Sequence, residues 1–155
     1  MHDAVKYSSV MAELRETLDQ QLWDFVAAYD AAYARAAQTV GLSAAQACLL
    51  DHLTDGSCAM GELAAELLCD ASNVTQLAAR LQARGLVERA SDPADRRIKR
   101  VSITPAGRDV QRAVRRAFAF PADRLGLLTE REQRQLSELL AKTMAPDAPA
   151  PPAHR

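Results

Sequence analysis

The sequence has 155 residues, of which 48% are hydrophobic and 25% are charged, and its formal net charge is −1. This balance is ordinary for one globular domain, and no apolar run approaches the ~20 residues that a membrane-spanning helix needs. The three cysteines are an odd number without the spacing of metal ligands, which excludes a disulfide-rich secreted scaffold and a zinc finger and favours a cytoplasmic location.

The charges are distributed unevenly along the chain. Residues 1–70 contain 3 basic and 11 acidic side chains, whereas residues 71–108 contain 8 basic and 3 acidic ones. A basic block in the middle of a nearly neutral protein is typical of contact with a polyanion, although many charge clusters are only solvated surface.

The first predicted element is a long helix over residues 8–38, a stretch that contains neither glycine nor proline. At the ordinary rise of an α-helix it is roughly 45 Å long. A helix of this length cannot easily bury an apolar stripe inside one small subunit, so we expect a dimer interface; a long intramolecular helix is the alternative. The stripe recurs at steps of three and four residues and consists of Val10, Leu14, Leu18, Leu22, Phe25, Tyr29 and Tyr33.

Three shorter helices are predicted next. Gly41 ends the long helix, and Ser43 with Gln46 forms a capping-box signature for the first of the three. Asp70 is expected to cap the third, and Gly85 is expected to close it. The predicted helices span residues 44–54, 60–68 and 71–84, with a turn at Asp55-Gly56 and a tight break at Cys69-Asp70.

The period then changes to that of β-strands. Residues 86–90 and 98–104 are short and are best interpreted as strands, and Val101 and Ile103 alternate with polar neighbours. The intervening SDPADRR contains a turn-forming Asp92-Pro93. We therefore predict a β-hairpin with a basic loop.

Two closing helices complete the predicted fold, which is mainly α with a small β-hairpin. Thr104-Pro105 is an N-cap followed by proline at the first helical position, and that helix should run to about residue 119 and break at Pro121. Thr129 and Glu132 form a capping box for a last helix over 130–144, with Leu136, Leu139 and Leu140 on one face. The Pro/Ala-rich residues 147–155 are predicted to be disordered.

The two faces of the predicted helix 71–84 differ sharply. Its core face should consist of Val74, Leu77, Ala78 and Leu81. Its outer face contains no acidic residue, and its short polar side chains and alanines suit close approach to base edges and phosphates. An ordinary polar surface is an equally good interpretation of this helix alone. The outer face consists of Ser72, Gln76, Ala79 and Ala83, flanked by Asn73, Thr75 and Arg80.

The neighbouring elements favour the DNA-binding interpretation. A short helix, a tight turn and the helix 71–84 make a helix-turn-helix, and the hairpin that follows is placed like the wing of a winged helix. Arg96 and Arg97 lie in the hairpin loop, and Lys99 and Arg100 begin its second strand. Arginine is well suited to phosphates and to a narrow minor groove.

The segment GELAAELLCDASNVTQLAARLQARGLVERASDPADRRIKRVSITPAG resembles the winged helix-turn-helix of MarR-family transcriptional regulators. The most specific similarity is Asp95-Arg96-Arg97 leading into Val101-Ser102-Ile103-Thr104, and GLVERASDPADRR is similar to the family's entry into the wing. The resemblance covers about residues 8–145. It implies a DNA-binding core at about 42–108, dimerisation helices at about 8–38 and 105–145, and a tail at 146–155.

The resemblance also implies roles for individual residues. Arg97 is then the wing arginine near the minor groove, and Asp95 holds the loop by pairing with a neighbouring arginine. Many relatives have a basic residue in place of Gln76, and glutamine favours adenine, so the base preference of relatives cannot be transferred. The expected major-groove residues are Ser72, Asn73, Thr75 and Gln76, and the expected phosphate contacts are Arg80, Arg96 and Lys99.

The cysteines leave open a redox-sensing regulator, a type that the family includes. Such members resemble one another in a reactive cysteine near the start of the first long helix, and this chain has none there. Cys48 and Cys69 are better interpreted as buried structural residues. Cys58 is expected in a loop, where it could be exposed, but no cation near it in the sequence would lower its pKa.

The sequence therefore predicts a homodimeric DNA-binding transcription regulator, in the simplest case a repressor. Its expected partners are a pseudo-palindromic double-stranded operator and a small effector, which in the family is often aromatic and binds near the first long helix, where Tyr33 is a candidate. A winged-helix module that binds protein instead of DNA is the main alternative. No catalytic set, phosphate loop or metal-ligand spacing is present in the sequence, so neither an enzyme nor a cofactor or metal is predicted.

Overall fold

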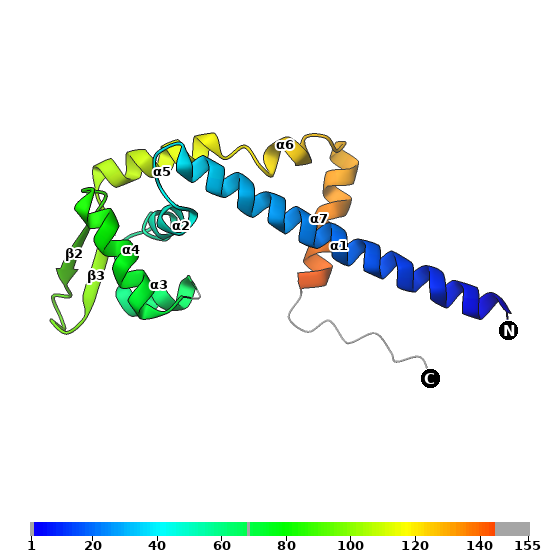
Figure 1. Ribbon diagram of the computed structural model, residues 1–155, viewed down its shortest axis with the longest axis horizontal. Helices are drawn as coiled ribbons and strands as arrows, with labels where there is room; N and C mark the ends of the chain where they lie inside the picture. The colour runs from blue at the N-terminus through cyan, green and yellow to red at the C-terminus, as the bar shows by residue number, and fades with distance from the viewer. Residues whose placement is uncertain (1, 68, 145–155) are drawn as a thin grey trace. The chain divides into compact units, whose positions relative to one another are not determined.

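The computed structural model describes residues 2–67 and 69–144, and the side chains from Val10 onward. Their contacts divide them into two compact units, one before Phe120 and one from Phe120 onward. The elements of the first unit are α1 (His2–Gln38), α2 (Ala44–His52), β1 (Cys58–Ala59), α3 (Met60–Glu66), α4 (Ala71–Ala83), β2 (Val87–Ser91), β3 (Lys99–Ile103) and α5 (Pro105–Ala117) (Figure 1). The second unit contains α6 (Ala122–Leu125) and α7 (Glu130–Met144).

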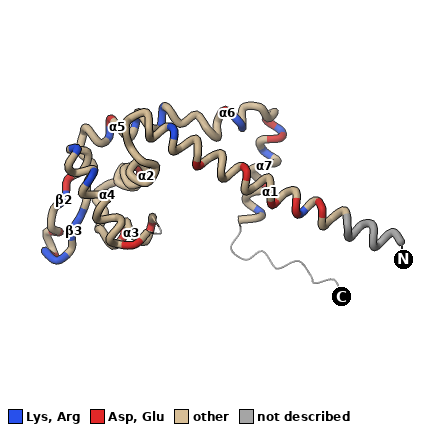
Figure 2. The backbone as a smooth tube through the Cα atoms, viewed as in Figure 1, with Lys and Arg blue, Asp and Glu red and all other residues tan. Residues whose placement is uncertain are grey.

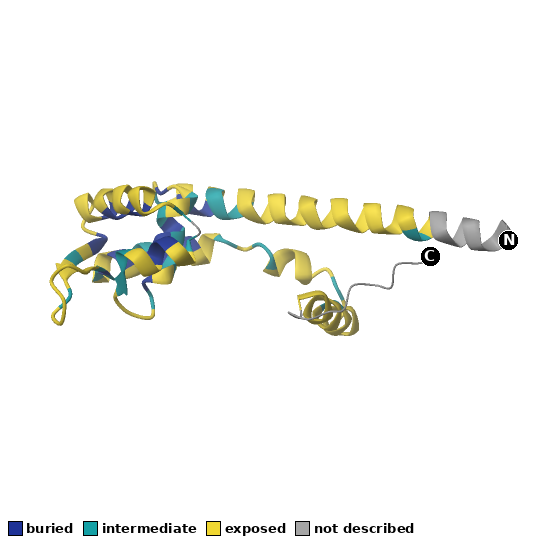
Figure 3. Ribbon diagram, turned by 90° about the horizontal axis from the view of Figure 1, so that it is seen from below, coloured by how far each residue is buried: buried dark blue, intermediate teal, exposed yellow. Residues whose placement is uncertain are grey.

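The long first helix is confirmed, and its two halves have different surroundings. Near its end, Ala36 and Ala37 are buried in the core, and Tyr33 packs against that core. Figure 3 shows the earlier part of α1 as exposed. Gly41, with φ of +67°, terminates the helix, because this backbone conformation is easily reached only by glycine. The exposed apolar side chains of α1 are Val10, Leu14, Leu18, Leu22, Trp23, Phe25, Val26 and Tyr29.

The capping box before α2 is confirmed. The Ser43 hydroxyl accepts a hydrogen bond from the Gln46 N–H at 3.2 Å, and the Gln46 side chain accepts one from the Ser43 N–H at 2.9 Å. The apolar side chains of α2 are central to one continuous core, which is shared by α4, the sheet and α5. The core residues of α2 and of its C-cap that are fully buried are Leu49, Leu50 and Leu53.

Helices α3 and α4 form the predicted helix-turn-helix, and the predicted core face of α4 is confirmed. Val74, Leu77, Ala78 and Leu81 are all buried. The expected cap differs in one respect: Asp70 occupies the N-cap position, but its side chain makes no capping hydrogen bond. Gly85, with φ of +70°, closes the helix, and the Leu86 N–H donates to the carbonyl of Leu81 at 3.0 Å. Residue 68, the predicted end of the preceding helix, lies outside the described residues.

The predicted hairpin is part of a larger sheet. Among the described residues the strand order is β1-β3-β2, with both pairings antiparallel. The expectation that Cys58 lies in a loop was wrong, because Cys58 pairs with Val101 and Ala59 pairs with Arg100. The segment before α3 is thereby attached to the central strand of the wing.

The N-cap of α5 is confirmed, since the Thr104 hydroxyl accepts a hydrogen bond from the Gly107 N–H at 3.0 Å. Gly107 lies so close to the strand entry that a Cβ atom there would be 2.0 Å from the Leu86 carbonyl oxygen. Helix α5 ends at Ala117, close to the predicted boundary.

In the second unit, the Thr129 and Glu132 capping box before α7 is confirmed by hydrogen bonds in both directions. The short α6 was not predicted. The predicted tail, residues 146–155, lies outside the described residues. No helix in the described part of the chain is long and apolar enough to cross a membrane.

Candidate nucleic-acid interface

The outer face of α4 is solvent-exposed, as predicted, because the opposite face is fixed in the core. The first turn of the helix contains no acidic residue. The Thr75 hydroxyl donates to the Ala71 carbonyl at 2.8 Å, which leaves its oxygen free to accept a hydrogen bond from a ligand. The positive end of the helix dipole lies at the same end. The sequence-predicted contact residues Ser72, Asn73, Thr75, Gln76 and Arg80 are all exposed.

The loop between β2 and β3 is ordered by its own aspartates. The Asp92 carboxylate accepts hydrogen bonds from the N–H groups of Ala94 at 2.8 Å and Asp95 at 3.4 Å. The Ile98 N–H donates to the Asp95 carbonyl at 2.9 Å. The Ala94 N–H is the main cause that lowers the pKa of Asp92, so this carboxylate stays ionised at neutral pH.

The predicted role of Asp95 needs a correction. Its carboxylate accepts a hydrogen bond from the backbone N–H of Arg97 at 2.9 Å, not from an arginine side chain. The arginine side chain paired in this loop within the described residues is Arg100, whose partner is Asp92 at 3.4 Å. Asp95 therefore orders the loop by bonding its backbone, which keeps the guanidinium of Arg97 available.

Alternation along β3 separates two neighbouring basic residues. Lys99 lies on the same face of the sheet as the buried Val101 and Ile103, whereas Arg100 lies on the opposite face. Arg96, Arg97 and Lys99 are all exposed, and the Lys99 ammonium donates to the Ser91 hydroxyl at 2.7 Å. In Figure 2 the basic positions of this hairpin gather at its loop.

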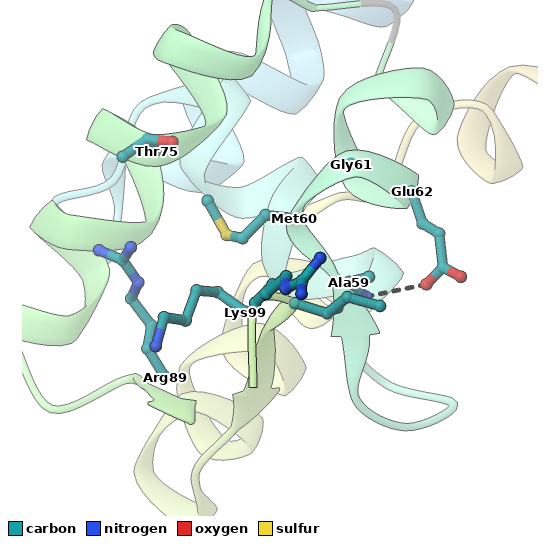
Figure 4. Close-up of a pocket in the computed structure, with 9 residues that line it drawn as sticks. Ala59, Met60, Gly61, Glu62, Thr75, Arg89 and Lys99 are labelled. Atoms are coloured by element: carbon teal, nitrogen blue, oxygen red, sulfur yellow. Dashed lines mark hydrogen bonds between the residues drawn. The ribbon is translucent and has the colours of Figure 1, made fainter. Parts of the chain in front are cut away.

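A basic hollow of about 480 Å³ connects the helix-turn-helix to the wing. Thr75 of α4 and Met60 of α3 lie on its helical side, and Arg97 and Lys99 lie on the wing side. Figure 4 shows Arg89 extending from β2 toward Thr75. Sequence reasoning missed Arg89, although its alternation with the buried Val87 could have placed it on this face.

Two of the cysteines, Cys48 and Cys58, lie in surroundings that disfavour the thiolate. Burial is the main cause that raises the pKa of both Cys48 and Cys58, and for Cys58 the raising effect exceeds the lowering effect of Arg100. All three cysteines are half-buried and free, and Cys69 packs against the core. Among the described residues no group of metal-ligating side chains is present.

A second cluster of polar side chains joins α1, α2 and α5. The Asp51 carboxylate accepts hydrogen bonds from the Tyr33 hydroxyl at 2.6 Å, the Gln111 amide at 2.6 Å and the Arg115 guanidinium at 3.2 Å. Burial and the Asp51 carboxylate both raise the pKa of Tyr33, so its hydroxyl remains a donor. Phe118 packs edge-on against Tyr33 at 5.3 Å between ring centroids.

The comparisons with known sequences agree with this geometry. A model described as the MarR family matches residues 40–98, which include the helix-turn-helix and the wing loop. YsmB of Bacillus subtilis (strain 168), an uncharacterized HTH-type transcriptional regulator, is 35% identical over 78 residues, or 50% of this chain and 53% of its own length. The match therefore spans about half the length of that curated relative.

Solved structures extend the similarity to most of the chain. A probable transcriptional regulator from Pseudomonas aeruginosa is 30% identical with a TM-score of 0.63, over 84% of this chain and 99% of that one. BpsR of Bordetella bronchiseptica, whose DNA binding is regulated by 6-hydroxynicotinic acid, is 27% identical with a TM-score of 0.65, over 83% and 94%. A mutant of MarR from E. coli, complexed with operator DNA, has the same fold at 23% identity, with a TM-score of 0.67 over 83% and 94%.

These matches agree with the helix-turn-helix and the three-stranded wing sheet, and together they define a winged-helix transcription regulator. Proteins of this class bind DNA and are not enzymes. The chain belongs to the MarR family.

Proposed function

We propose that this protein is a homodimeric repressor that binds a specific double-stranded operator through α4 and the wing. The observation that supports this most directly is the juxtaposition at the basic hollow, where Thr75 of the acid-free face of α4 lines one surface with three basic side chains of the hairpin and one acidic residue of α3, Glu62. A DNA duplex offers base edges and phosphates at the spacing that such a surface can contact together.

Each group has a distinct part in the proposed complex. The polar residues at the start of α4 contact base edges in the major groove, where Gln76 favours adenine. Arg97 enters the minor groove from the wing loop, held in position by Asp95. The proposed major-groove set is Ser72, Asn73, Thr75 and Gln76, and the proposed phosphate contacts are Arg80, Arg96 and Lys99.

The exposed stripe of α1 supports a second copy as the binding partner. Val10, Leu14, Leu18 and Leu22 are each between 48% and 60% exposed. An apolar face of that extent is stabilised by burial against another subunit. Two copies related by a two-fold axis place their α4 helices in successive major grooves, about 34 Å apart, so the operator is a pseudo-palindrome.

A small effector is proposed to release the DNA. The comparison with BpsR, which 6-hydroxynicotinic acid regulates, supports this part of the proposal. A hollow of about 430 Å³ between α1 and α2, lined by residues that include Tyr29, Tyr33 and His52, is a candidate site. A ligand that stabilises a different spacing of the two winged regions would remove DNA contacts at one half-site. Effector binding would then be coupled to DNA binding and would weaken it.

Selection of bound fragments from random and genomic DNA tests the proposal. We expect a two-fold symmetric sequence to be enriched and log affinity to fall steeply with log salt, by roughly 0.9 per phosphate neutralised. Arg97→Ala should weaken binding and reduce that slope by about one unit. Arg112→Ala is the matched control, since this arginine lies on α5 and pairs with Asp109.

Two outcomes would contradict the proposal. A chain that enriches no DNA and shows no salt-dependent binding would support the alternative of a winged-helix module that binds protein. A monomer in sedimentation measurements at micromolar concentration would contradict the assignment of the α1 stripe to a dimer.

A further inference from the structure

Arg100 lies in the basic block of the sequence, but its side chain is engaged inside the protein. Its Nε donates to the Ser57 hydroxyl at 3.0 Å, and one terminal nitrogen donates to the Ser57 carbonyl at 2.5 Å. The other terminal nitrogen pairs with Asp92 at 3.4 Å. The guanidinium thus uses every one of its nitrogens on protein acceptors, which is the arrangement of a structural contact.

The strands around Arg100 provide space for this contact. Its cross-strand neighbours are Ala59 on β1 and Ala90 on β2, so small side chains flank it on both sides. The Arg100 side chain is 32% exposed and that of Asp92 is 18% exposed, whereas the exposed pair of Arg134 with Glu130 has values of 71% and 88%. The guanidinium therefore lies across the face of the sheet that is opposite to Lys99.

The two partners of Arg100 belong to the two parts of the interface. Asp92 orders the wing loop through the Ala94 N–H. Ser57 immediately precedes β1, which continues into α3, and α3 packs against α4. The contact therefore connects the base of the wing to the start of the helix-turn-helix.

We propose that Arg100 is a positioning residue that fixes the orientation of the wing relative to α4, and that it does not contact DNA. This inference rests on the proposed function, since it concerns how the two DNA-contacting parts are aligned. It separates Arg100 from Arg96 and Arg97, which the sequence presents as members of the same basic run.

Two substitutions distinguish positioning from a phosphate contact. Arg100→Lys keeps the positive charge but cannot form the three-point contact, so we expect about a tenfold loss of affinity, the factor given by one lost charge-assisted hydrogen bond, with an unchanged salt slope. Asp92→Asn can still accept from the Ala94 N–H but loses its charge toward Arg100. It should also weaken binding, although removing a negative charge near DNA would otherwise strengthen it.

A measurement without DNA tests the same contact. Trypsin cleavage after Arg96 and Arg97 reports opening of the wing loop, and it should be several-fold faster in Arg100→Lys and Asp92→Asn than in the wild type. Arg112→Ala is the control and should leave the rate unchanged. Thermal unfolding of each variant shows whether the fold is intact. If Arg100→Lys does not fold, Asp92→Asn tests the same contact by itself.

The outcomes separate this inference from the proposed function. Three results would each overturn the positioning role of Arg100. The first is wild-type affinity for DNA in Arg100→Lys, the second is tighter DNA binding in Asp92→Asn, and the third is an unchanged rate of trypsin cleavage in both variants. If the wild type binds no DNA, the proposed function fails, and the trypsin rates alone decide whether Arg100 holds the wing.

Discussion

Helix α4 and the wing line one surface, but different forces hold them in place. Four side chains of α4 are buried in the core, and Val74, Ala78 and Leu81 have no exposed area. The wing loop between β2 and β3 has one half-buried residue, and its conformation depends on hydrogen bonds to Asp92 and Asp95. The helix is thus positioned by packing and the wing loop by local polar contacts, so changes in the two regions should separate stability from DNA binding.

The largest expected effect concerns the packing of α4. Leu81→Ala should lower the free energy of unfolding by about 2–5 kcal/mol, because the side chain is fully buried and its removal leaves a cavity. Gln76→Ala on the exposed face of the same helix should change stability by less than about 0.5 kcal/mol. Urea denaturation of both variants measures the difference. Equal stability losses would show that α4 is not anchored by its core face.

A smaller effect is expected where the wing joins the next helix. Gly107→Ala places a Cβ against the Leu86 carbonyl oxygen, so α5 and the entry to β2 must move apart. Overpacking of this kind costs about 1–3 kcal/mol. Gly61→Ala is the matched control, since no atom lies within 4 Å of its added Cβ. Thermal unfolding should place the two variants several degrees apart.

Loss of one wing hydrogen bond should affect DNA binding more than stability. Asp95→Ala removes the acceptor of the Arg97 N–H, which is exposed, so the free energy of unfolding should fall by no more than about 1 kcal/mol. Affinity for the selected DNA should nevertheless fall several-fold, because Arg97 is no longer presented in a fixed position. A variant that loses stability but keeps full affinity would contradict the loop-ordering role of Asp95.

The smallest effect is expected at the edge strand of the wing sheet. The pKa of the Cys58 thiol is raised, mainly by burial, so iodoacetamide at pH 7.5 should react with it more slowly than with glutathione. The remaining thiols are distinguished by mass spectrometry of peptides. Rapid modification with loss of DNA binding would favour the alternative of a cysteine-based redox regulator.

Periodicity and caps predicted the regular part of this fold. The apolar steps in 71–84 gave the correct core face of α4, and the signatures at Ser43, Thr104 and Thr129 each mark a helix start in the structure. These signals succeed because a cap or an amphipathic face depends on residues close together in the sequence.

The errors concern contacts between distant segments. Strand β1 has two residues, too few for an alternating pattern, and it exists because Cys58 meets Val101. The partner of Asp95 was misassigned because the backbone N–H of Arg97, only two residues away, competes with arginine side chains for the same carboxylate. For Arg100, the sequence shows a charge but not the serine 43 positions away that accepts its hydrogen bonds.

The Asp51 carboxylate limits which parts of the first unit can move independently. It accepts from Tyr33 on α1 and from Gln111 on α5, and Gln111 is only 5% exposed. Separating these helices would strand a buried amide without an acceptor, which is energetically unfavourable. We therefore expect the end of α1 to move together with α2 and α5, and in the proposed dimer we expect the hinge that alters the spacing of the half-sites to lie outside these helices.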